Sequence, residues 1–266
     1  MNSLLQRINQ LREAKPELSQ ANGPTKSYNC PTCRDEEGYI ERDENGVEVY
    51  RFCECRDKNQ LERSFRSSKI TSEFSKRSFD NFETSGRPQA VIDAYKFSRI
   101  YADNFQDIKD ERHNSICLLG RPGCGKTHLL MAVCNQLMKT KYLYDVIRYP
   151  SVLYFPWVEG FNEIKDDLSQ MEEKINRMKK VDVLYIDDMF KGRKEPTQFQ
   201  IEQMFAVINY RYMEKKPVII SSERDIDEMC DIDEGIGSRI NEMCKDFRII
   251  LKGGRELNYR LREDAV

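Results

Sequence analysis

The feature that most constrains this chain is an octapeptide, Gly120-Arg121-Pro122-Gly123-Cys124-Gly125-Lys126-Thr127, which fits the pattern G-x-x-x-x-G-K-[ST]. It follows an apolar run, Ile116 to Leu119, and precedes a run with helical periodicity that ends near Lys139. In that setting the glycines let backbone N–H groups turn toward an anion, and the helix N-terminus adds its dipole. Lys126 then reaches the terminal phosphates of a nucleotide, and the Thr127 hydroxyl binds Mg²⁺. The segment predicts a site for ATP and Mg²⁺.

A second apolar run, Val183 to Ile186, ends in two carboxylates, Asp187 and Asp188. The carboxyl end of a parallel strand points into the crevice where ligands bind, so the pair is expected beside the P-loop. We expect Asp187 to hold the magnesium shell and Asp188 to polarise the attacking water through its position and charge. Without the P-loop, a helix N-cap or a loop would explain two such residues equally well.

Strand-like and helix-like runs alternate through most of the chain. This alternation predicts an α/β fold in which a parallel sheet lies between helices. The expected strands are Ile116 to Leu119, Val152 to Phe155, Val183 to Ile186 and Val218 to Ser221. The expected helices include one that follows the Gly-rich turn and ends near Lys139, and one from Gln198 to Met213. The acidic run from Asp225 to Glu234 is most simply a solvated loop.

A compact unit with four cysteines precedes this core. Cys30 and Cys33 stand before one alternating run, Cys53 and Cys55 follow another, and Asn45-Gly46 separates the two runs. Asn-Gly between alternating runs indicates a β-hairpin, which brings both cysteine pairs to its base. Four thiolates gathered in this way match a tetrahedral zinc site, and the metal would supply folding energy that so short a segment lacks. Because Cys-x-Cys is tighter than the usual Cys-x-x-Cys, four free or oxidisable thiols remain the alternative.

The pattern predicts three segments. Residues 1–56 contain a short amphipathic helix, Asn2 to Ala14, and the zinc hairpin, residues 57–78 form a polar linker, and residues 79–266 form the nucleotide-binding domain. The N-terminal helix packs on its own domain or docks on another protein, and its short apolar stripe does not decide between the two. The linker is mildly basic, and a solvated segment is a simpler interpretation than a strip that contacts DNA.

Composition limits the classes of partner and compartment. Charged residues make up 33% of the chain but the net charge is only -2, so contact with nucleic acid needs a local basic surface. The N-terminal residues lack a signal peptide, and no run is long and apolar enough to span a membrane. A cytoplasmic protein is expected, in which the five cysteines outside the hairpin are small apolar residues.

With both halves of the nucleotide site in place, the chain resembles the AAA+ ATPases of the bacterial and phage helicase-loader family, the DnaC/DnaI-like proteins, which are related to IstB-like ATPases. The resemblance covers about Phe79 to Arg260. Its carriers are Phe79-Asp80-Asn81-Phe82, Gly125-Lys126-Thr127-His128-Leu129, Tyr185-Ile186-Asp187-Asp188, Ile208-Asn209-Tyr210-Arg211-Tyr212, Ile219-Ile220-Ser221-Ser222-Glu223 and Ile236-Gly237-Ser238-Arg239-Ile240. The cysteine segment is similar to the zinc-binding N-terminal region of the DnaI-like branch.

The resemblance implies further roles. Arg239 matches the arginine that reaches the γ-phosphate of a neighbouring subunit, His128 directly follows the P-loop, and Arg260 is a second phosphate sensor. Either Ser222 or Glu223 is the polar sensor, and Glu223 departs from the family because many relatives have Asn there. Because six residues follow Arg260, we expect the C-terminal helical lid of larger AAA+ proteins to be missing.

The resemblance implies an ATPase that is weak until assembly or DNA stimulates it. It would self-associate through its AAA+ interfaces, bind a hexameric replicative helicase and deliver it onto single-stranded DNA. Two alternatives stay open: an IstB-like helper ATPase for transposition, and a zinc-containing adaptor whose P-loop does not hydrolyse ATP.

Overall fold

The computed structural model describes residues 28–140, 142–143, 147–192 and 195–261. The chain divides into two compact units, Met1–Arg56 and Asp57–Val266. We call the described part of the first unit, residues 28–56, the cysteine module, and we call the second the C-terminal unit. The expected N-terminal helix, Asn2 to Ala14, lies outside the described residues.

A five-stranded parallel sheet forms the centre of the C-terminal unit. Its spatial order is β6 (Val152–Pro156), β7 (Val183–Met189), β8 (Val218–Ser222), β3 (Ile116–Gly120) and β9 (Arg248–Leu251). Every neighbouring pair is parallel. The four strands expected from the sequence are present, and the predicted α/β class is confirmed.

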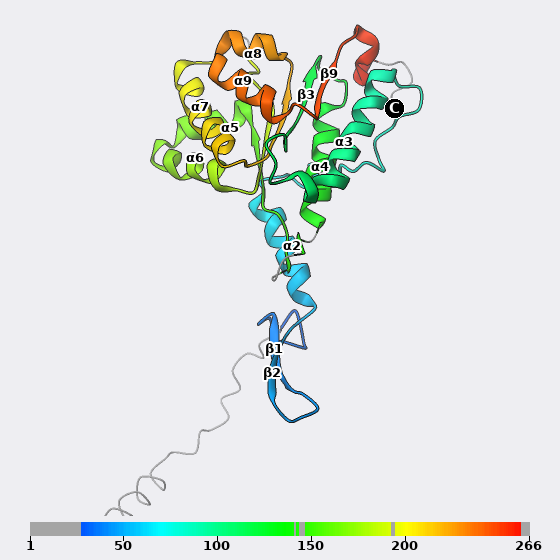
Figure 1. Ribbon diagram of the computed structural model, residues 1–266, viewed down its shortest axis with the longest axis vertical. Coiled ribbons are helices and arrows are strands. Elements are labelled where there is room, and N and C mark those ends of the chain that lie inside the picture. Colours follow the sequence, from blue (N-terminus) through cyan, green and yellow to red (C-terminus); the bar gives the residue numbers. More distant parts are fainter. Residues whose placement is uncertain (1–27, 141, 144–146, 193–194, 262–266) are drawn as a thin grey trace, which may run out of the picture. The chain divides into compact units, whose positions relative to one another are not determined.

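Successive side chains on each strand enter opposite cores, as the pleat of a buried parallel strand requires. In β3, Ile116 and Leu118 pack in one apolar cluster, whereas Cys117 and Leu119 pack in the other. Figure 1 shows α3 and α4 on one side of the sheet and α5 to α9 on the other. The helices are α3 (Gln89–Ile108), α4 (Lys126–Lys139), α5 (Trp157–Asp166), α6 (Met171–Lys180), α7 (Gln198–Met213), α8 (Ile226–Ile232) and α9 (Glu234–Met243).

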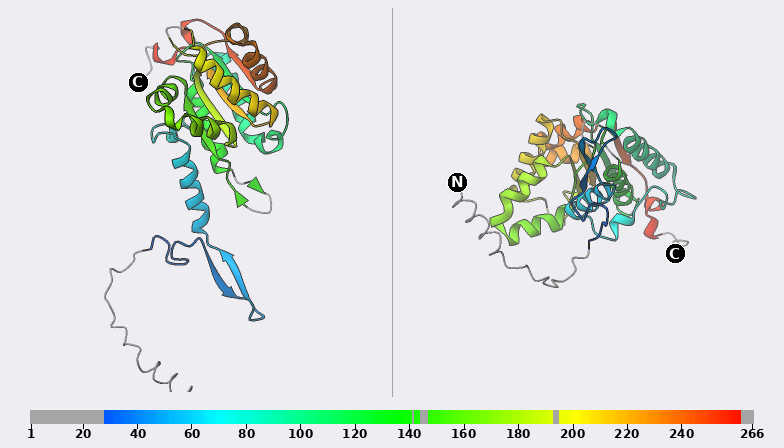
Figure 2. Two further views of the ribbon diagram at one scale, coloured as in Figure 1. Left: turned by 90° about the vertical axis from the view of Figure 1, so that its left-hand side faces the viewer. Right: turned by 90° about the horizontal axis from the view of Figure 1, so that it is seen from below.

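Short elements complete the C-terminal unit. Figure 2 shows β4 (Tyr142–Leu143) and β5 (Ile147–Arg148) as a pair separate from the main sheet. The 3-10 turns are η1 (Phe74–Lys76), η2 (Leu168–Gln170), η3 (Arg255–Leu257) and η4 (Tyr259–Leu261). None of the helices in the described ranges combines the length and hydropathy of a membrane span.

The segment predicted to be a solvated linker, residues 57–78, is folded, so that interpretation is wrong. It contains most of α2 (Cys55–Ser67) and all of η1. Phe65 and Phe74 pack against the core of the C-terminal unit, and the Asn135 side chain on α4 donates hydrogen bonds to the carbonyl oxygens of Phe74 and Arg77 at 3.0 and 2.7 Å. These long-range contacts outweigh a polar local composition.

The acidic run is also ordered, which corrects the prediction of a solvated loop between Asp225 and Glu234. Asp225 and Glu228 form a capping box, with Asp225 Oδ1 accepting from the Glu228 N–H at 3.0 Å and Glu228 Oε2 accepting from the Asp225 N–H at 2.8 Å. Acidic side chains are favourable at a helix N-terminus because the helix dipole is positive there. The charges therefore begin α8 instead of solvating a loop.

The cysteine module is built on a two-stranded antiparallel hairpin, β1 (Gly38–Arg42) and β2 (Glu48–Phe52). Its turn contains Asn45-Gly46, with Gly46 at φ 79°, as the sequence predicts. The Cys53 N–H donates to the Glu37 carbonyl at 3.0 Å, which places the second cysteine pair next to the first. The hairpin thus brings both pairs to one end.

Candidate active site

The P-loop connects β3 to α4 and adopts a conformation that depends on glycine. Gly120, Gly123 and Gly125 have φ values of 130°, 76° and 100°, in the region that side-chain-bearing residues rarely adopt. A Cβ at Gly123 would lie 1.9 Å from Asn258 Oδ1, and one at Gly120 would lie 2.4 Å from the Leu251 carbonyl oxygen. The loop is therefore enclosed by the C-terminal segment of the same unit.

Lys126 lies at the start of α4, and its ammonium is held by the loop itself. Its Nζ donates to the carbonyl oxygens of Gly120 and Arg121 at 2.7 and 2.9 Å. Only 5% of Lys126 is exposed, so its ammonium contacts the loop and is shielded from bulk solvent. An ammonium at the N-terminus of α4 is suited to bind the terminal phosphates of a nucleotide.

Asp187 is a buried carboxylate surrounded by hydroxyl donors. Its Oδ1 accepts from Thr127, Tyr185 and Ser221 at 3.1, 2.6 and 2.5 Å, and its Oδ2 accepts from Tyr154 at 3.1 Å. Burial and the charge of Asp187 raise the pKa of Tyr154 and of Tyr185 well above the usual value, so both phenols stay protonated donors. The network joins Thr127 to Asp187, the two residues predicted to bind Mg²⁺.

Asp188 lies next to Asp187 but belongs to a separate group of charges. Its Oδ2 accepts from Lys191 Nζ at 2.6 Å, and the same ammonium lies 3.4 Å from Glu223 Oε1. Burial disfavours the charge on Lys191, but the hydrogen bond and charge of Asp188, together with the charge of Glu223, raise its pKa above the ordinary value. Lys191 is therefore charged at neutral pH.

A cleft of about 600 Å³ unites most of the predicted site residues. The predicted residues that line it are Pro122, Gly123, Gly125, Lys126, Thr127, His128, Asp187, Asp188, Glu223 and Arg260. Gly120 and the buried Cys124 support the loop from behind, since the Cys124 thiol donates to the Arg121 carbonyl at 2.9 Å. The volume lies in the range of small-molecule and cofactor pockets.

His128 anchors the segment that enters the C-terminal unit. Its Nε2 lies 3.1 Å from the Ser78 carbonyl oxygen and 2.9 Å from Asn81 Oδ1, and its ring packs edge-on against Phe82. The Asn81 amide nitrogen donates to the Lys76 carbonyl, so Oδ1 is the acceptor and His128 Nε2 carries the proton. Burial lowers the pKa of His128, which favours the neutral imidazole.

Besides Gly120 and Cys124, two predicted site residues, Ser222 and Arg239, do not line this cleft. Ser222 is buried, and its hydroxyl donates to the Met189 carbonyl at 2.7 Å, so Glu223 and not Ser222 reaches the cleft from the end of β8. Arg239 lies on α9, where it donates to the Gly235 carbonyl and its guanidinium lies over the rings of Phe205 and Tyr212 at 5.3 and 5.5 Å. Arg239 therefore cannot act on this cleft from its position within the same subunit.

The four cysteines of the cysteine module converge. Their sulfur atoms all lie within 4.8 Å of one another, with Cys30 and Cys53 3.6 Å apart and Cys33 and Cys55 3.3 Å apart. Sulfur atoms that share a tetrahedral Zn²⁺ with bonds of about 2.3 Å are separated by about 3.8 Å, so the cluster fits this metal. The backbone N–H of Cys33 lowers the pKa of the Cys30 thiol to about 6, whereas contact with Cys33 raises the pKa of the Cys55 thiol and the pKa of Cys53 is raised as well, so Cys30 is the first thiolate that the cluster offers to a metal. These four residues can hold a zinc ion.

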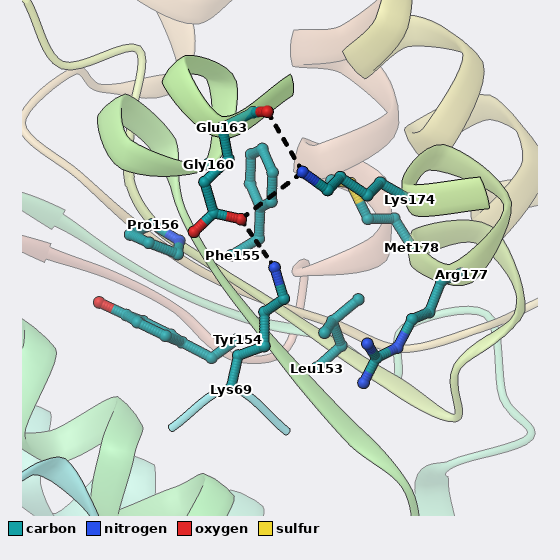
Figure 3. Close-up of a pocket in the computed structure, with 10 residues that line it drawn as sticks. All are labelled: Lys69, Leu153, Tyr154, Phe155, Pro156, Gly160, Glu163, Lys174, Arg177 and Met178. Carbon is teal, nitrogen blue, oxygen red and sulfur yellow. Dashed lines mark hydrogen bonds and ion pairs between the residues drawn. The ribbon is translucent and has the colours of Figure 1, made fainter. Parts of the chain in front are cut away.

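A second, smaller cavity of about 40 Å³ lies between β6, α5 and α6 (Figure 3). Leu153, Phe155 and Met178 are among its lining residues, and Lys69 and Lys174 both contact the Glu163 carboxylate, at 2.8 and 3.8 Å. Its ammonium groups are thus already paired. This cavity serves as a packing junction rather than a nucleotide site.

Sequence reasoning missed several residues that build the cleft. Tyr154 and Tyr185 lie in apolar runs that predicted buried strands. The runs did not predict that the two hydroxyl groups donate to Asp187. Arg87 donates to the carbonyl oxygens of Cys124 and Leu257 at 3.3 and 3.4 Å, and no local pattern marks it. Lys191 follows Asp188 by three residues, and this spacing in the sequence could have indicated an ion pair between them.

Comparison with known proteins identifies the ATPase-domain family that this chain matches. Residues 76–244 match the model of the bacterial DnaA ATPase domain. XkdC, a protein of the phage-like element PBSX of Bacillus subtilis strain 168, is 44% identical over 261 residues, which cover 96% of this chain and 95% of XkdC. The chain spans less than half the length of the DnaA proteins of Geotalea daltonii, Thermoanaerobacter sp. strain X514 and Caldanaerobacter subterraneus, to which it is 26%, 35% and 30% identical.

Two solved structures share the fold. The DnaI crystal structure aligns with a TM-score of 0.53 at 24% identity, over 69% of this chain and 95% of DnaI. The DnaC helicase loader aligns with a TM-score of 0.52 at 22% identity, over 68% of this chain and all of the other, 100%. At these identities the likeness concerns the fold.

Proposed function

We propose, because this chain belongs to the bacterial DnaA ATPase-domain family of AAA+ proteins, that it is an ATP-dependent loader that delivers a replicative helicase onto single-stranded DNA. The observation that carries the proposal is the cleft that joins Lys126, Thr127, Asp187 and Asp188. These residues supply what phosphoryl transfer to water requires: a phosphate cradle, two oxygen ligands for Mg²⁺ and a carboxylate that orients water. Mg²⁺ bound there would neutralise charge that develops on the phosphates.

The position of Arg239 supports an assembled enzyme. Because this guanidinium lies away from the cleft of its own subunit, it is available to the cleft of a neighbour. In other NTPases an arginine supplied in this way accelerates hydrolysis by about 10³ to 10⁵. Hydrolysis would then be slow in the isolated subunit and would follow assembly.

The cysteine module has a surface suited to hold the helicase. Ile40, Tyr50 and Phe52 share one face of the hairpin and are 66%, 55% and 62% exposed. The surrounding charge is acidic, with four arginines and no lysine against eight acidic residues between Tyr28 and Arg56. Acidic charge repels nucleic acid, so this apolar face favours a protein partner, and DNA would contact the C-terminal unit. Zinc bound by the four cysteines would hold this face in shape.

The test is a pull-down with native mass determination, using the cognate replicative helicase with and without ATP and Mg²⁺. We expect a stable complex that is lost in a Tyr50→Ser, Phe52→Ser double variant. Leu168→Ser is the matched control, because Leu168 is equally exposed at 62% but lies in the C-terminal unit. A helicase that fails to bind the wild-type protein under any nucleotide condition would refute the loader function.

Hydrolysis is tested separately. Lys126→Ala is expected to abolish ATP binding, whereas Arg239→Ala is expected to retain binding and lose turnover. Mixing the Arg239→Ala and Asp188→Ala proteins places an intact arginine opposite an intact carboxylate in some interfaces, so turnover should partly recover. Absence of recovery would contradict action between subunits.

A further inference from the structure

The cleft contains an electrostatic conflict. Asp187, Asp188 and Glu223 all line the space in which the negatively charged phosphates of ATP would lie. Asp187 is held by four hydroxyl donors and directed at Thr127, so a bound Mg²⁺ would compensate it. Asp188 and Glu223 have no such metal-directed role, and like charges close together in a partly dehydrated cleft repel each other.

Lys191 is placed to resolve this conflict. Its ammonium contacts Asp188 Oδ2 at 2.6 Å and Glu223 Oε1 at 3.4 Å, and it lines the same cleft. The three side chains are 45%, 31% and 38% exposed, which leaves them screened but not fully solvated. Among the residues that the structure describes, Lys191 is thus the cation that contacts both carboxylates, on the side where a triphosphate would bind.

The backbone fixes Lys191 in this position. The Lys191 N–H donates to the Asp188 carbonyl at 3.0 Å, which closes a tight turn at the end of β7. Asp188 and Phe190 have φ values of 52° and 61°, unusual for residues with side chains, and such strain persists only where surrounding structure enforces it. Here Phe190 packs against Trp157 with ring centroids 5.0 Å apart, and the Ser222 hydroxyl holds the Met189 carbonyl.

We propose that Lys191 is a positioning residue of the ATP site: it neutralises Asp188 and Glu223 as a pair and thereby lets both share the cleft with a triphosphate. The inference rests on the proposed ATP site and adds a residue that the P-loop and the Asp pair do not include. The strained turn then has a role as well. It reverses the chain direction after Asp188, so that the Lys191 ammonium contacts the Asp188 carboxylate.

The test measures equilibrium binding of a fluorescent ATP analogue with Mg²⁺ to the full chain. Lys191→Met removes the ammonium that contacts both Asp188 and Glu223. We expect roughly tenfold weaker binding, with a deficit that shrinks as salt is added. Lys191→Arg keeps the charge and should bind nearly as the wild type does. The double variant Lys191→Met, Glu223→Gln removes one of the repelling charges, so it should recover most of the lost affinity.

Lys69→Met is the matched control. Lys69 is 44% exposed and pairs with Glu163 at 2.8 Å in the small cavity of Figure 3, so its loss removes a similar ion pair outside the cleft. Wild-type affinity in Lys191→Met would overturn the inference, as would a double variant that binds as weakly as the single one. If circular dichroism shows that Lys191→Met has lost secondary structure, Lys191→Gln takes its place. A folded Lys191→Gln protein with wild-type affinity would also overturn the inference. Failure of the wild-type protein to bind the analogue would refute the ATP site itself.

Discussion

Replacing Arg211 by methionine tests how the C-terminal unit is held together beneath the cleft. Arg211 lies on α7 and is fully buried, at 0% exposure. Its Nη1 donates to the carbonyl oxygens of Met178, Lys179 and Val181 at 2.8, 3.2 and 2.9 Å, and its Nη2 donates to those of Asp182 and Pro217 at 3.0 and 2.6 Å. The last carbonyls of a helix lack partners within it, so Arg211 completes the C-terminal end of α6 from another helix.

The expected loss follows from those carbonyls. A buried polar group that loses its only partner costs about 1–3 kcal/mol, and Met178, Lys179 and Val181 each lose a donor. Burial lowers the pKa of Arg211 to about 9, so replacing it by methionine also removes the cost of burying a charge. Together these effects are expected to lower the free energy of unfolding by roughly 3–5 kcal/mol. For a unit of this size such a loss lowers the melting temperature by about 10 °C.

The assay is urea unfolding of the full chain monitored by circular dichroism, with the tryptophan fluorescence of Trp157 as a second probe. Arg211→Lys offers three donors and should recover part of the loss, because an ammonium cannot span all five carbonyls. Arg112→Met is the control, since Arg112 donates to the Tyr212 carbonyl at 2.7 Å from a side chain that is 37% exposed, and should cost less than about 1 kcal/mol. An Arg211→Met protein within about 1 kcal/mol of wild type would refute the reasoning.

Three further predictions concern the site. Burial lowers the pKa of His128 below its ordinary 6.5, so its contribution to stability is complete above about pH 6.5 and declines as pH falls through the folded-state pKa; melting curves should show this decline in the wild type and not in His128→Gln. Cys33→Ser should abolish binding of one zinc ion per chain, measured by a chelator-release assay, whereas Cys230→Ser, outside the cluster, should leave it intact. Tyr185→Phe removes a donor from Asp187 and is expected to weaken Mg²⁺-dependent ATP binding about tenfold, with wild-type affinity as the contrary result.

Local chemistry predicted the parts of the site that lie within a few residues of one another. The P-loop, the Asp pair and the Asn-Gly hairpin each need a particular residue at a particular backbone conformation, so their sequence is distinctive. Choosing between Ser222 and Glu223 needed the strand register, because alternate residues of β8 face opposite cores.

Contacts between distant segments were not predictable in this way. The Ser-rich segment that holds α2 has a polar composition, and contacts with distant residues, such as the hydrogen bonds from Asn135 about sixty residues away, show that it is folded. Strand β9 was missed because it has four residues and only Leu251 is buried. Acidic residues at Asp225 and Glu228 are compatible with either a loop or a capped helix, and the reciprocal backbone bonds decide for the helix.

The enclosure of the P-loop by the C-terminal segment has a consequence for biosynthesis. Gly120 pairs with Leu251 on β9, the Gly123 carbonyl accepts from the Tyr259 N–H at 2.9 Å, and Arg87 links Cys124 to Leu257. A ribosome therefore makes the phosphate cradle long before it makes the residues that close it. A nascent chain should acquire nucleotide affinity abruptly, once residues 248–260 have left the exit tunnel, and ATP would then act as a late ligand that favours the completed fold.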